Sequence, residues 1–459
     1  MQVRHKMKRD DGSVGPRGNA EDVQDWLQGL TRFGIRPGLE RMRWMLDRLG
    51  HPERGLRFLH VAGTNGKGST CAFLESILDA AGYRVGMFIS PPMAGERSRV
   101  SVGGQAIPED VLIGYLRVLQ PLARELEVRE DLGALTHFEV WTLVALRYFE
   151  QTRPDVVVWE TGLGGRLDST NVVVPEAAVI TQVGFDHMGV LGHTIKQIAT
   201  EKAGIIKERV PVFTTANGVA LRVIDEVAAG VNSAVWALDR EWAVADRRVL
   251  RLGAGLPPEG QQFSWSGDGE TISDLRIRLL GAHQCENAGV AVAVARYLDR
   301  SGVLSVPGWA IRRGLERAAW PGRLEVAGLS PLILLDGAHN PDGARRLAEA
   351  LREIRPGTWG LVVGVLADKD VDGILSALKD VASWMIATAP DTPRAMDPDS
   401  LATRMRRIGA EVAAVCPNPL DALETAAAAV GSGGAVCVTG SLYMVMDVRA
   451  GGKLRVESQ

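Results

Sequence analysis

The sequence contains few cysteines, and no two of them are close together in the chain. Cys71, Cys285, Cys416 and Cys437 are far apart and include no CxxC pair. This pattern argues against a disulfide framework and against a structural zinc site. We therefore expect a cytoplasmic protein in a reducing compartment.

The sequence also lacks an excess of charge of either sign. Over 459 residues, 52 Lys and Arg stand against 55 Asp and Glu, which leaves a net charge of −3. Such a chain has no electrostatic footprint for nucleic acid or for an anionic membrane, so we expect neither as a partner. Apolar residues at 46% and charged residues at 23% are ordinary for a globular protein and exclude disorder over the whole chain. The length allows two or three domains.

No apolar run has the pattern of a secretory signal or a membrane span. The first residues carry charges with no apolar stretch behind them, so we predict a disordered leader over residues 1–22. The longest uncharged stretch, residues 425–446, could reach across a bilayer, but four glycines interrupt it. This favours a helix end, a turn and a buried strand.

What the chain does contain is an alternation of short apolar runs, glycine-containing loops and helical patterns. The runs are rich in Val and Ile without polar alternation, as in strands that are buried on both faces. The helical pattern that starts at Thr136 has Glu139 three residues on, which is a capping-box signature. The alternation predicts an α/β fold with a mostly parallel sheet. The runs cover residues 57–63, 83–90, 155–162 and 177–184.

Two changes of pattern divide the chain. Residues 238–280 are rich in Gly, Ser and Trp with short alternating runs, which predicts an antiparallel insertion. Pro321 and Gly322 then end a helical pattern, so 318–323 is a linker or hinge. We predict a first domain over 23–318 and a smaller α/β domain over 319–459. The second domain's strands are expected at 332–339, 360–365, 384–390, 411–416 and 435–440.

The segment HVAGTNGKGST, residues 60–70, joins a strand to a helix through a glycine loop. Its backbone N–H groups and the helix N-terminus can hold a phosphate, and Lys67 can reach the outer phosphates. The spacing departs from G-x-x-x-x-G-K-[ST], because Gly68 separates Lys67 from Ser69. An incidental lysine in a glycine-rich turn is the alternative. The order of the elements favours a phosphate site made by Gly63, Thr64, Asn65, Gly66, Lys67, Gly68 and Ser69.

Three polar side chains follow other predicted strands. Ser90, Glu160 and His187 lie just past apolar runs, and ligands bind beyond the carboxyl ends of parallel strands. Together they can form part of a Mg²⁺ shell, in which the imidazole is the unusual member. A turn role for Ser90 and a core role for His187 stay open. For His60 and His193 we expect no site role.

Lys202 lies on a helix that Thr194 and Gln197 cap in the same S/T-x-x-E/Q pattern. From the residues alone, Lys202 is expected to be solvated and paired with Glu201.

The motifs of this chain, taken in order, resemble those of the Mur-ligase superfamily, and within it the folylpolyglutamate and bifunctional dihydrofolate synthases. The resemblance extends from about residue 25 to residue 449. It is carried by HVAGTNGKGST, SPPM, THFEVWT, WETGLGGRLDSTNVV, GFDHMGVLGHTIKQIATEKAGIIK, GAHQCENA, WPGRLE, LDGAHNPDG, LADKD and TGSLY.

The resemblance implies a P-loop ATPase domain, a Rossmann-like glutamate-ligase domain and an active site between them. It implies two Mg²⁺ ions, one at Ser90, Glu160 and His187, the other at a carbamylated Lys202. We expect Lys67, Lys202 and His339 to be catalytic, although the sequence does not assign the base for the amine and His339 is only a candidate for it. The resemblance places Asn287, Arg323 and Asp336 around ATP. It assigns the substrate side to Thr136, His137, Phe138, Glu139, Leu167, Asp168 and Ser169, and it places Ser441 near the cleft on the C-terminal side.

The implied reaction adds L-glutamate to a folate or dihydropteroate carboxylate through an acyl phosphate made from ATP. We expect a monomer that uses these small molecules alone. Two positions depart from the family pattern: Pro92 stands where the family usually has histidine, and Ser98 where it has glutamate. Folate recognition is therefore the part of the resemblance that carries over least. The sequence leaves open whether dihydropteroate, folates or both are accepted.

Two other functions remain as alternatives. One is a Mur-type ligase that joins an amino acid to a different carboxylate, such as a cell-wall precursor. The early position of the phosphate loop leaves no room for the N-terminal domain that such ligases usually carry. The other is an NTP-driven switch, which would hydrolyse ATP without an amine acceptor.

Overall fold

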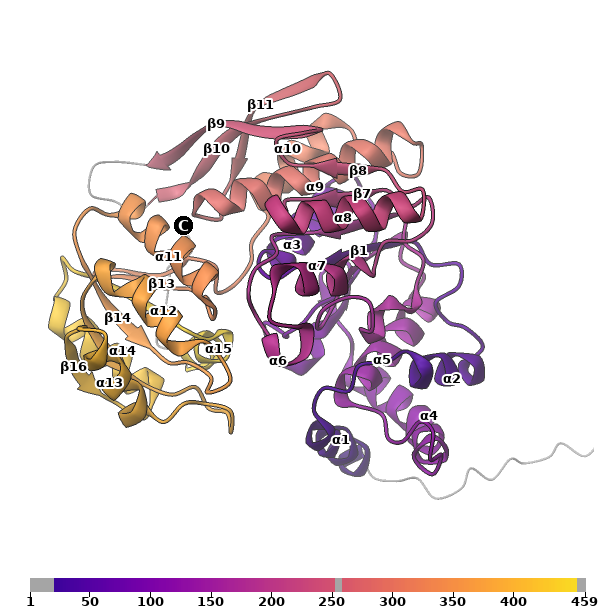
Figure 1. Cartoon of the computed structure of the whole chain (residues 1–459), viewed down its shortest axis with the longest axis horizontal. Coiled ribbons are helices and arrows are strands. Elements are labelled where there is room, and N and C mark those ends of the chain that lie inside the picture. Colours follow the sequence, from indigo (N-terminus) through magenta and orange to yellow (C-terminus); the bar gives the residue numbers. More distant parts are fainter. Residues whose placement is uncertain (1–19, 252–257, 452–459) are drawn as a thin grey trace, which may run out of the picture.

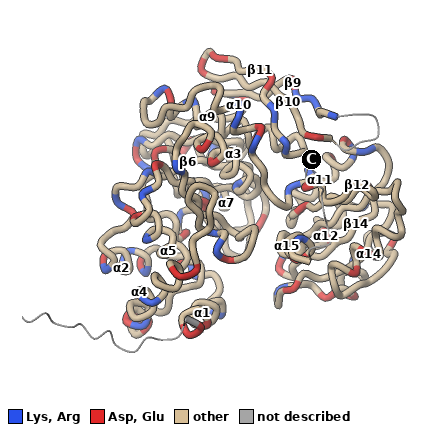
Figure 2. The backbone as a smooth tube through the Cα atoms, turned by 180° about the vertical axis from the view of Figure 1, so that it is seen from behind, with Lys and Arg blue, Asp and Glu red and all other residues tan. Residues whose placement is uncertain are grey.

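The computed structural model describes residues 20–251 and 258–451. Of the predicted leader, residues 1–19 lie outside this range, and residues 20–22 belong to helix α1 (Ala20–Gly29). Lys and Arg are interspersed with Asp and Glu over both halves of the molecule (Figure 2). No helix in the described ranges is long and apolar enough to cross a membrane.

The first half is built on an eight-stranded sheet with the order β4-β3-β2-β5-β1-β6-β7-β8. From β2 to β8 every neighbouring pair is parallel, and β3 and β4 add an antiparallel edge. The predicted mostly parallel sheet is thus confirmed. The strands are β1 (Phe58–Ala62), β2 (Val85–Phe88), β3 (Val100–Val102), β4 (Gln105–Ala106), β5 (Val156–Glu160), β6 (Ala177–Ile180), β7 (Val212–Thr214) and β8 (Val235–Ala237).

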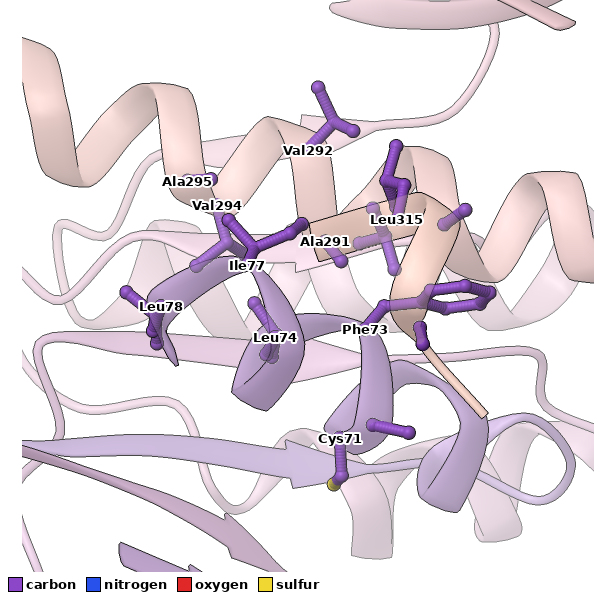
Figure 3. Close-up of a cluster of buried hydrophobic side chains, with 14 of the residues drawn as sticks. Cys71, Phe73, Leu74, Ile77, Leu78, Ala291, Val292, Val294, Ala295 and Leu315 are labelled. Carbon is purple, nitrogen blue, oxygen red and sulfur yellow. The ribbon is translucent and has the colours of Figure 1, made fainter. Parts of the chain in front are cut away.

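Helices cover both faces of this sheet (Figure 1). On one face, α3 (Lys67–Ala80), α9 (Ala282–Arg300) and α10 (Gly308–Arg317) pack on alternate residues of the central strands. Figure 3 shows Phe73, Leu74 and Ile77 of α3 meeting Ala291 and Leu315 of the other two helices. This packing fixes the helix that follows the phosphate loop. The other face is covered by α1, α2 (Glu40–Leu49), α4 (Glu109–Glu127), α5 (His137–Thr152), α7 (Ile195–Ala203) and α8 (Gly218–Gly230).

The predicted antiparallel insertion is confirmed as a three-stranded sheet of β9 (Trp242–Arg251), β10 (Pro258–Gly267) and β11 (Glu270–Ile277). It packs on α9 and extends over both halves of the molecule (Figure 1). Arg247 of β9 donates to the Glu353 carboxylate at 3.0 Å, and Arg251 to the Glu353 carbonyl at 2.6 Å. This small sheet therefore ties the first half to the second.

The second half is a six-stranded sheet with the order β12-β13-β17-β14-β15-β16, parallel except for the edge strand β12 (Glu325–Leu329). The parallel strands lie within or beside the five predicted runs: β13 (Leu332–Leu335), β14 (Trp359–Val363), β15 (Ala382–Ala387), β16 (Val412–Val415) and β17 (Ala435–Thr439). One face carries α11 (Pro341–Ile354), α12 (Val371–Leu378) and α13 (Pro398–Arg407). The other carries α14 (Pro419–Val430) and α15 (Leu442–Ala450).

The uncharged stretch 425–446 contains the end of α14, a turn, the buried strand β17 and then the start of α15. The predicted helix end, turn and strand are therefore confirmed. The segment between α10 and β12 contains no helix or strand, in agreement with a linker over 318–323.

Candidate active site

The carboxyl ends of both sheets face one cavity of about 510 Å³. The structure brings every residue that the sequence singled out for the site to the wall of this cavity. They are Gly63, Thr64, Asn65, Gly66, Lys67, Gly68, Ser69, Ser90, Thr136, His137, Phe138, Glu139, Glu160, Leu167, Asp168, Ser169, His187, Lys202, Asn287, Arg323, Asp336, His339 and Ser441.

The phosphate loop runs from Gly63 to Gly66 and opens directly into α3. Gly63 and Gly66 have φ angles of +149° and +91°, which side chains disfavour. A Cβ on Gly63 would collide with the Thr181 hydroxyl, and a Cβ on Gly66 with the Asn287 amide. The loop needs glycine at both positions, because its backbone lies against these neighbours.

Two hydroxyls in the first turn of α3 are buried and have no hydrogen-bond partner among the described residues, those of Ser69 and Thr70. Buried polar groups are normally hydrogen-bonded, so an orphan group needs an explanation. No side chain caps this helix N-terminus either. Unpartnered donors at a helix N-terminus are what an anion such as phosphate uses.

Glu160, at the end of β5, is almost completely buried. Burial raises the pKa of its carboxyl to about 7, although the positive charge of Lys67 and a hydrogen bond from the Ser90 backbone oppose this. Ser90 N donates to Glu160 Oε2 at 3.2 Å, and Arg99 Nη1 donates to Ser90 Oγ at 3.3 Å. The strand ends thus meet as expected, and a cation beside Glu160 would favour its ionised form.

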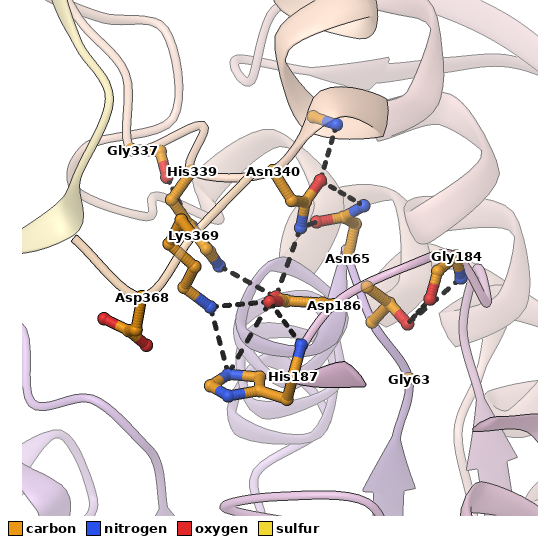
Figure 4. Close-up of polar contacts among 12 residues, drawn as sticks. Gly63, Asn65, Gly184, Asp186, His187, Gly337, His339, Asn340, Asp368 and Lys369 are labelled. Carbon is orange, nitrogen blue, oxygen red and sulfur yellow. Dashed lines mark hydrogen bonds and ion pairs between the residues drawn. The ribbon is translucent and has the colours of Figure 1, made fainter. Parts of the chain in front are cut away.

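His187 and Asp186 lie in the segment between β6 and α6 (Met188–Leu191), facing residues of the second half (Figure 4). Lys369 Nζ is 2.6 Å from Asp186 Oδ1 and 3.2 Å from His187 Nε2. Burial lowers the pKa of the His187 imidazole to about 4, and the Asp186 charge opposes this only in part. Burial acts to raise the pKa of the Asp186 carboxyl, but His339 and Lys369 hold it below its ordinary value.

His339 follows β13 and faces the same carboxylate, with Nε2 3.5 Å from Asp186 Oδ2. Its Nδ1 lies 2.8 Å from the Gly337 carbonyl oxygen. Because both neighbours are acceptors, both ring nitrogens are placed to donate. In this arrangement each ring nitrogen of His339 already faces an acceptor oxygen.

Lys202 is buried and donates from Nζ to the Gly63 carbonyl at 2.8 Å. Glu201 instead pairs with Arg166 at 2.7 Å. The expectation from the residues alone, a solvated lysine paired with Glu201, is therefore wrong, because the helix turns Lys202 toward the loop. Burial and the nearby charge of Lys67 lower the pKa of the Lys202 ammonium to about 7.

Three residues assigned to the nucleotide come from different parts of the chain: Asn287 from α9, Arg323 from the segment before β12, and Asp336 from just after β13. Asn287, on α9, touches the loop at Gly66 and donates to Gln284 Oε1 at 3.1 Å. Asp336 accepts hydrogen bonds from the Leu324 and Ala338 backbones at 3.0 and 2.9 Å. Burial raises the pKa of the Asp336 carboxyl, and the charge of Arg323 opposes this.

The polar side chains assigned to the substrate side already form hydrogen bonds with other groups of the protein. Thr136 and Glu139 form the predicted capping box of α5, and Glu139 also pairs with the buried Arg41 at 2.9 Å. Ser441 caps α15 by accepting from the Tyr443 backbone N–H. The remaining polar contacts include those of His137 with Trp141, Asp168 with Leu163 N and Thr170, and Ser169 with Thr142.

His60 and His193 take no part in the cavity wall. His60 is buried with Nε2 3.0 Å from Thr170 Oγ1, and that hydroxyl donates to Asp168. The Thr170 hydrogen is thus committed to Asp168, so His60 must donate from Nε2. It is a core histidine whose one side-chain hydrogen bond reaches the edge of the site, while its Nδ1 is buried without a partner among the described residues.

Both departures from the family pattern lie in the loop after β2. Ser98 donates to the Gly95 carbonyl at 2.8 Å and accepts from the Met93 and Ala94 backbones. It closes the turn instead of presenting a carboxylate. Arg99 has its ion pair with Glu96, at 2.9 Å.

Several cavity residues were missed by the sequence argument. Asp186 was noticed only as the neighbour of His187, and Lys369 only as part of LADKD. Trp320 and Arg99 also line the cavity, and Asn340 bridges the halves through Asn65 Oδ1 at 2.9 Å. Their signal was their place in motifs such as LADKD, WPGR and DGAHNPDG, since no spacing rule brings residues of two separate sheets together.

Two family models match the chain. The Mur ligase middle domain matches residues 134–295, and the Mur ligase glutamate ligase domain matches residues 322–442. Among curated proteins, the chain is 38% identical to a Bacillus subtilis dihydrofolate synthase/folylpolyglutamate synthase, over 94% of this chain and 98% of that protein. It is 34% identical to the Lacticaseibacillus casei folylpolyglutamate synthase, over 82% of this chain and 87% of the relative.

Solved structures agree with these relatives. The Mycobacterium tuberculosis folylpolyglutamate synthase complexed with ADP and AMPPCP superposes with a TM-score of 0.85, at 31% identity over 94% of this chain and 98% of that one. The E. coli FolC protein in complex with DHPP and ADP gives a TM-score of 0.81, at 32% identity over 93% of this chain and 97% of that one.

Proposed function

The chain belongs to the Mur ligase family, among the folylpolyglutamate and dihydrofolate synthases, and we propose that it joins L-glutamate to the carboxylate of a folate or a dihydropteroate by means of ATP. The observation that carries this proposal is the gathering of the TNGKGS loop, Glu160, His187 and Lys202 around one cavity. The second sheet supplies the opposite wall, where an amine substrate can meet the activated acid.

The residues fit magnesium-bound phosphates. No group of three or more His, Cys, Asp and Glu side chains in the described ranges is arranged to hold a metal. We propose that the protein supplies Ser90, Glu160 and His187 to one Mg²⁺, with water and phosphate oxygens completing the shell. Bound Mg²⁺ would polarise the phosphoryl oxygens and neutralise their charge.

Lys202 is proposed to carry a carbamate that binds a second Mg²⁺. Its neutral amine would add CO₂, forming an N–C bond and releasing one proton. The proposal is supported by the family resemblance and by the burial of Nζ beside the phosphate loop. A carbamate replaces the ammonium with an anionic oxygen ligand, which suits Mg²⁺ better than an amine does.

The proposed reaction has two steps. A carboxylate is a poor acceptor for an amine because it is anionic and lacks a leaving group. Its oxygen attacks the γ-phosphorus of ATP, which forms an acyl phosphate and releases ADP, while Lys67 neutralises the developing charge. The amine of glutamate then attacks the acyl carbon and phosphate leaves. The amine loses a proton, for which His339 is the candidate base, once it no longer donates to Asp186.

Exclusion of water would protect the acyl phosphate from hydrolysis. We assign residues 23–318 and 319–459 to two domains that open and close about Pro321. We propose that the protein acts as a monomer. The four unpaired cysteines fit a reducing cytoplasm.

The test is ADP release by the purified protein with ATP and Mg²⁺. Dihydropteroate and a reduced folate are each supplied with and without L-glutamate. We expect sustained ADP release only when both an acceptor and glutamate are present, and the active acceptor identifies the substrate. Release that depends on neither would instead favour an NTP-driven switch.

A further inference from the structure

The tip of one lysine is buried between the two halves of the molecule. Lys369 lies in the loop between β14 and α12, and its side chain is only 6% exposed. Its ammonium crosses to the first half, where it meets Asp186 Oδ1 at 2.6 Å and His187 Nε2 at 3.2 Å (Figure 4). The backbone of Lys369 is bonded to Leu366 and Val371, and neither of these bonds involves the side chain.

The contact with His187 settles which atom donates. An ammonium has three donors and no acceptor, so His187 Nε2 must present its lone pair to Lys369. A metal ion bound through Nε2 would need that same lone pair. The ammonium therefore stands where such an ion would stand, and two cations at one position repel each other strongly in a poorly solvated site.

We propose that Lys369 is a positioning residue, a tethered cation that fills the His187 side of the metal site until a divalent ion displaces it. The inference rests on the proposed metal role of His187. Because Lys369 belongs to the second half, metal binding and the contact between the halves become coupled.

The neighbours of Asp186 make this displacement feasible. When Lys369 leaves, the Asp186 carboxylate keeps the Asn340 amide at 3.4 Å and His339 Nε2 at 3.5 Å. It also keeps the backbone N–H of His187 at 2.8 Å. A divalent ion beside it would replace the lost positive charge, so no buried carboxylate is left uncompensated.

The test is Mn²⁺ binding to the full chain without nucleotide, followed by electron paramagnetic resonance. We expect Lys369→Met to bind Mn²⁺ at least tenfold more tightly than the parent chain. Lys369→Arg, which keeps the cation, should stay near the parent affinity and shows that the loop tolerates substitution. Lys196→Met, at an exposed position on α7, is the matched control and should change nothing.

His187→Asn separates the two proposals. If it weakens Mn²⁺ binding while Lys369→Met leaves the affinity unchanged or lower, the lysine inference is overturned and the metal site stands. If His187→Asn has no effect, the metal role of His187 fails and the inference fails with it.

A second measurement does not depend on a variant. Amine acetylation of the parent chain, followed by mass spectrometry, should label Lys369 several-fold faster when Mg²⁺ alone is added. Equal labelling with and without Mg²⁺ would contradict displacement.

Discussion

At the scale of single residues, the polar groups in the cavity divide into those that the fold already uses and those that it leaves free. Glu139 and Asp168 accept several hydrogen bonds each from their own neighbours. The hydroxyls of Ser69 and Thr70 have none in the described structure. The second group marks where a ligand must supply what the protein does not.

Lys67 begins the helix after the phosphate loop, and its charge acts to lower the pKa values of Glu160 and Lys202. If it neutralises the transferring phosphate, Lys67→Met should lower kcat for ADP release by about 10³-fold or more. Lys196→Met serves as the control for loss of one positive charge. A loss below tenfold in Lys67→Met would contradict the role at the phosphate.

The buried imidazole of His60 should make the free energy of unfolding depend on pH. Burial lowers its imidazole pKa from 6.5 to about 3, so between these values the unfolded chain binds a proton that the folded chain does not. Its contribution is present above pH 6.5 and is lost as the pH falls toward 3, with a slope of up to about 1.4 kcal/mol per pH unit.

Urea unfolding of the parent chain and of His60→Gln between pH 7.5 and pH 5 measures this contribution. The glutamine keeps a donor for Thr170 but cannot be protonated. We expect the stability advantage of the parent chain to shrink as the pH falls. An advantage that stays constant over this range would rule out the buried neutral imidazole.

At the scale of elements, two capping boxes of the same pattern occupy different surroundings. Thr136 and Glu139 begin α5 inside the protein, where Glu139 also holds the buried Arg41. Thr194 and Gln197 begin α7 at the exposed surface. The same capping pattern therefore contributes differently to the stability of the fold in the two helices.

Glu139→Gln should lower the free energy of unfolding by about 3–5 kcal/mol, because it leaves the guanidinium of Arg41 buried without its counter-ion. Thr194→Ala removes only an exposed cap and should cost about 1 kcal/mol. Urea denaturation of both variants compares the two. Equal losses would contradict the role of the buried ion pair.

The elements also show what the sequence could predict. The Val- and Ile-rich runs located most strands of both parallel sheets, and the capping patterns located α5 and α7, because these signals are local. The sequence missed β3, β4, β7 and β8, which have only two or three residues each, and β12, which is an antiparallel edge strand. The burial of Lys202 was missed because it depends on which face of α7 meets the loop, a tertiary property.

At the scale of the whole molecule, few segments connect the halves. The chain crosses once, between α10 and β12, and polar contacts cross at Asp186 with Lys369 and at Asn65 with Asn340. The three-stranded sheet adds the pair of Arg247 with Glu353. Sequence patterns marked the crossing but not these contacts, since each joins residues more than 100 positions apart.

Arg247→Ala should loosen the two halves without unfolding either one. The pair is partly exposed, so its loss should change stability by no more than about 1 kcal/mol. We expect the radius of gyration from small-angle X-ray scattering to increase while the thermal midpoint stays within a few degrees.

Arg296→Ala is the matched control, because Arg296 pairs with Glu270 and Asp299 within the first half. It should leave the radius of gyration unchanged. An identical radius for Arg247→Ala and the parent chain would show that the pair of Arg247 with Glu353 does not hold the halves together.

The unequal burial of the four thiols has a practical consequence. Cys71, Cys285 and Cys437 are buried, whereas Cys416 is partly accessible just past the edge strand of the second sheet. A maleimide fluorophore added to the natural chain should therefore attach at that one position. Its emission would test the proposed opening and closing of the second half during turnover, without any engineered labelling site.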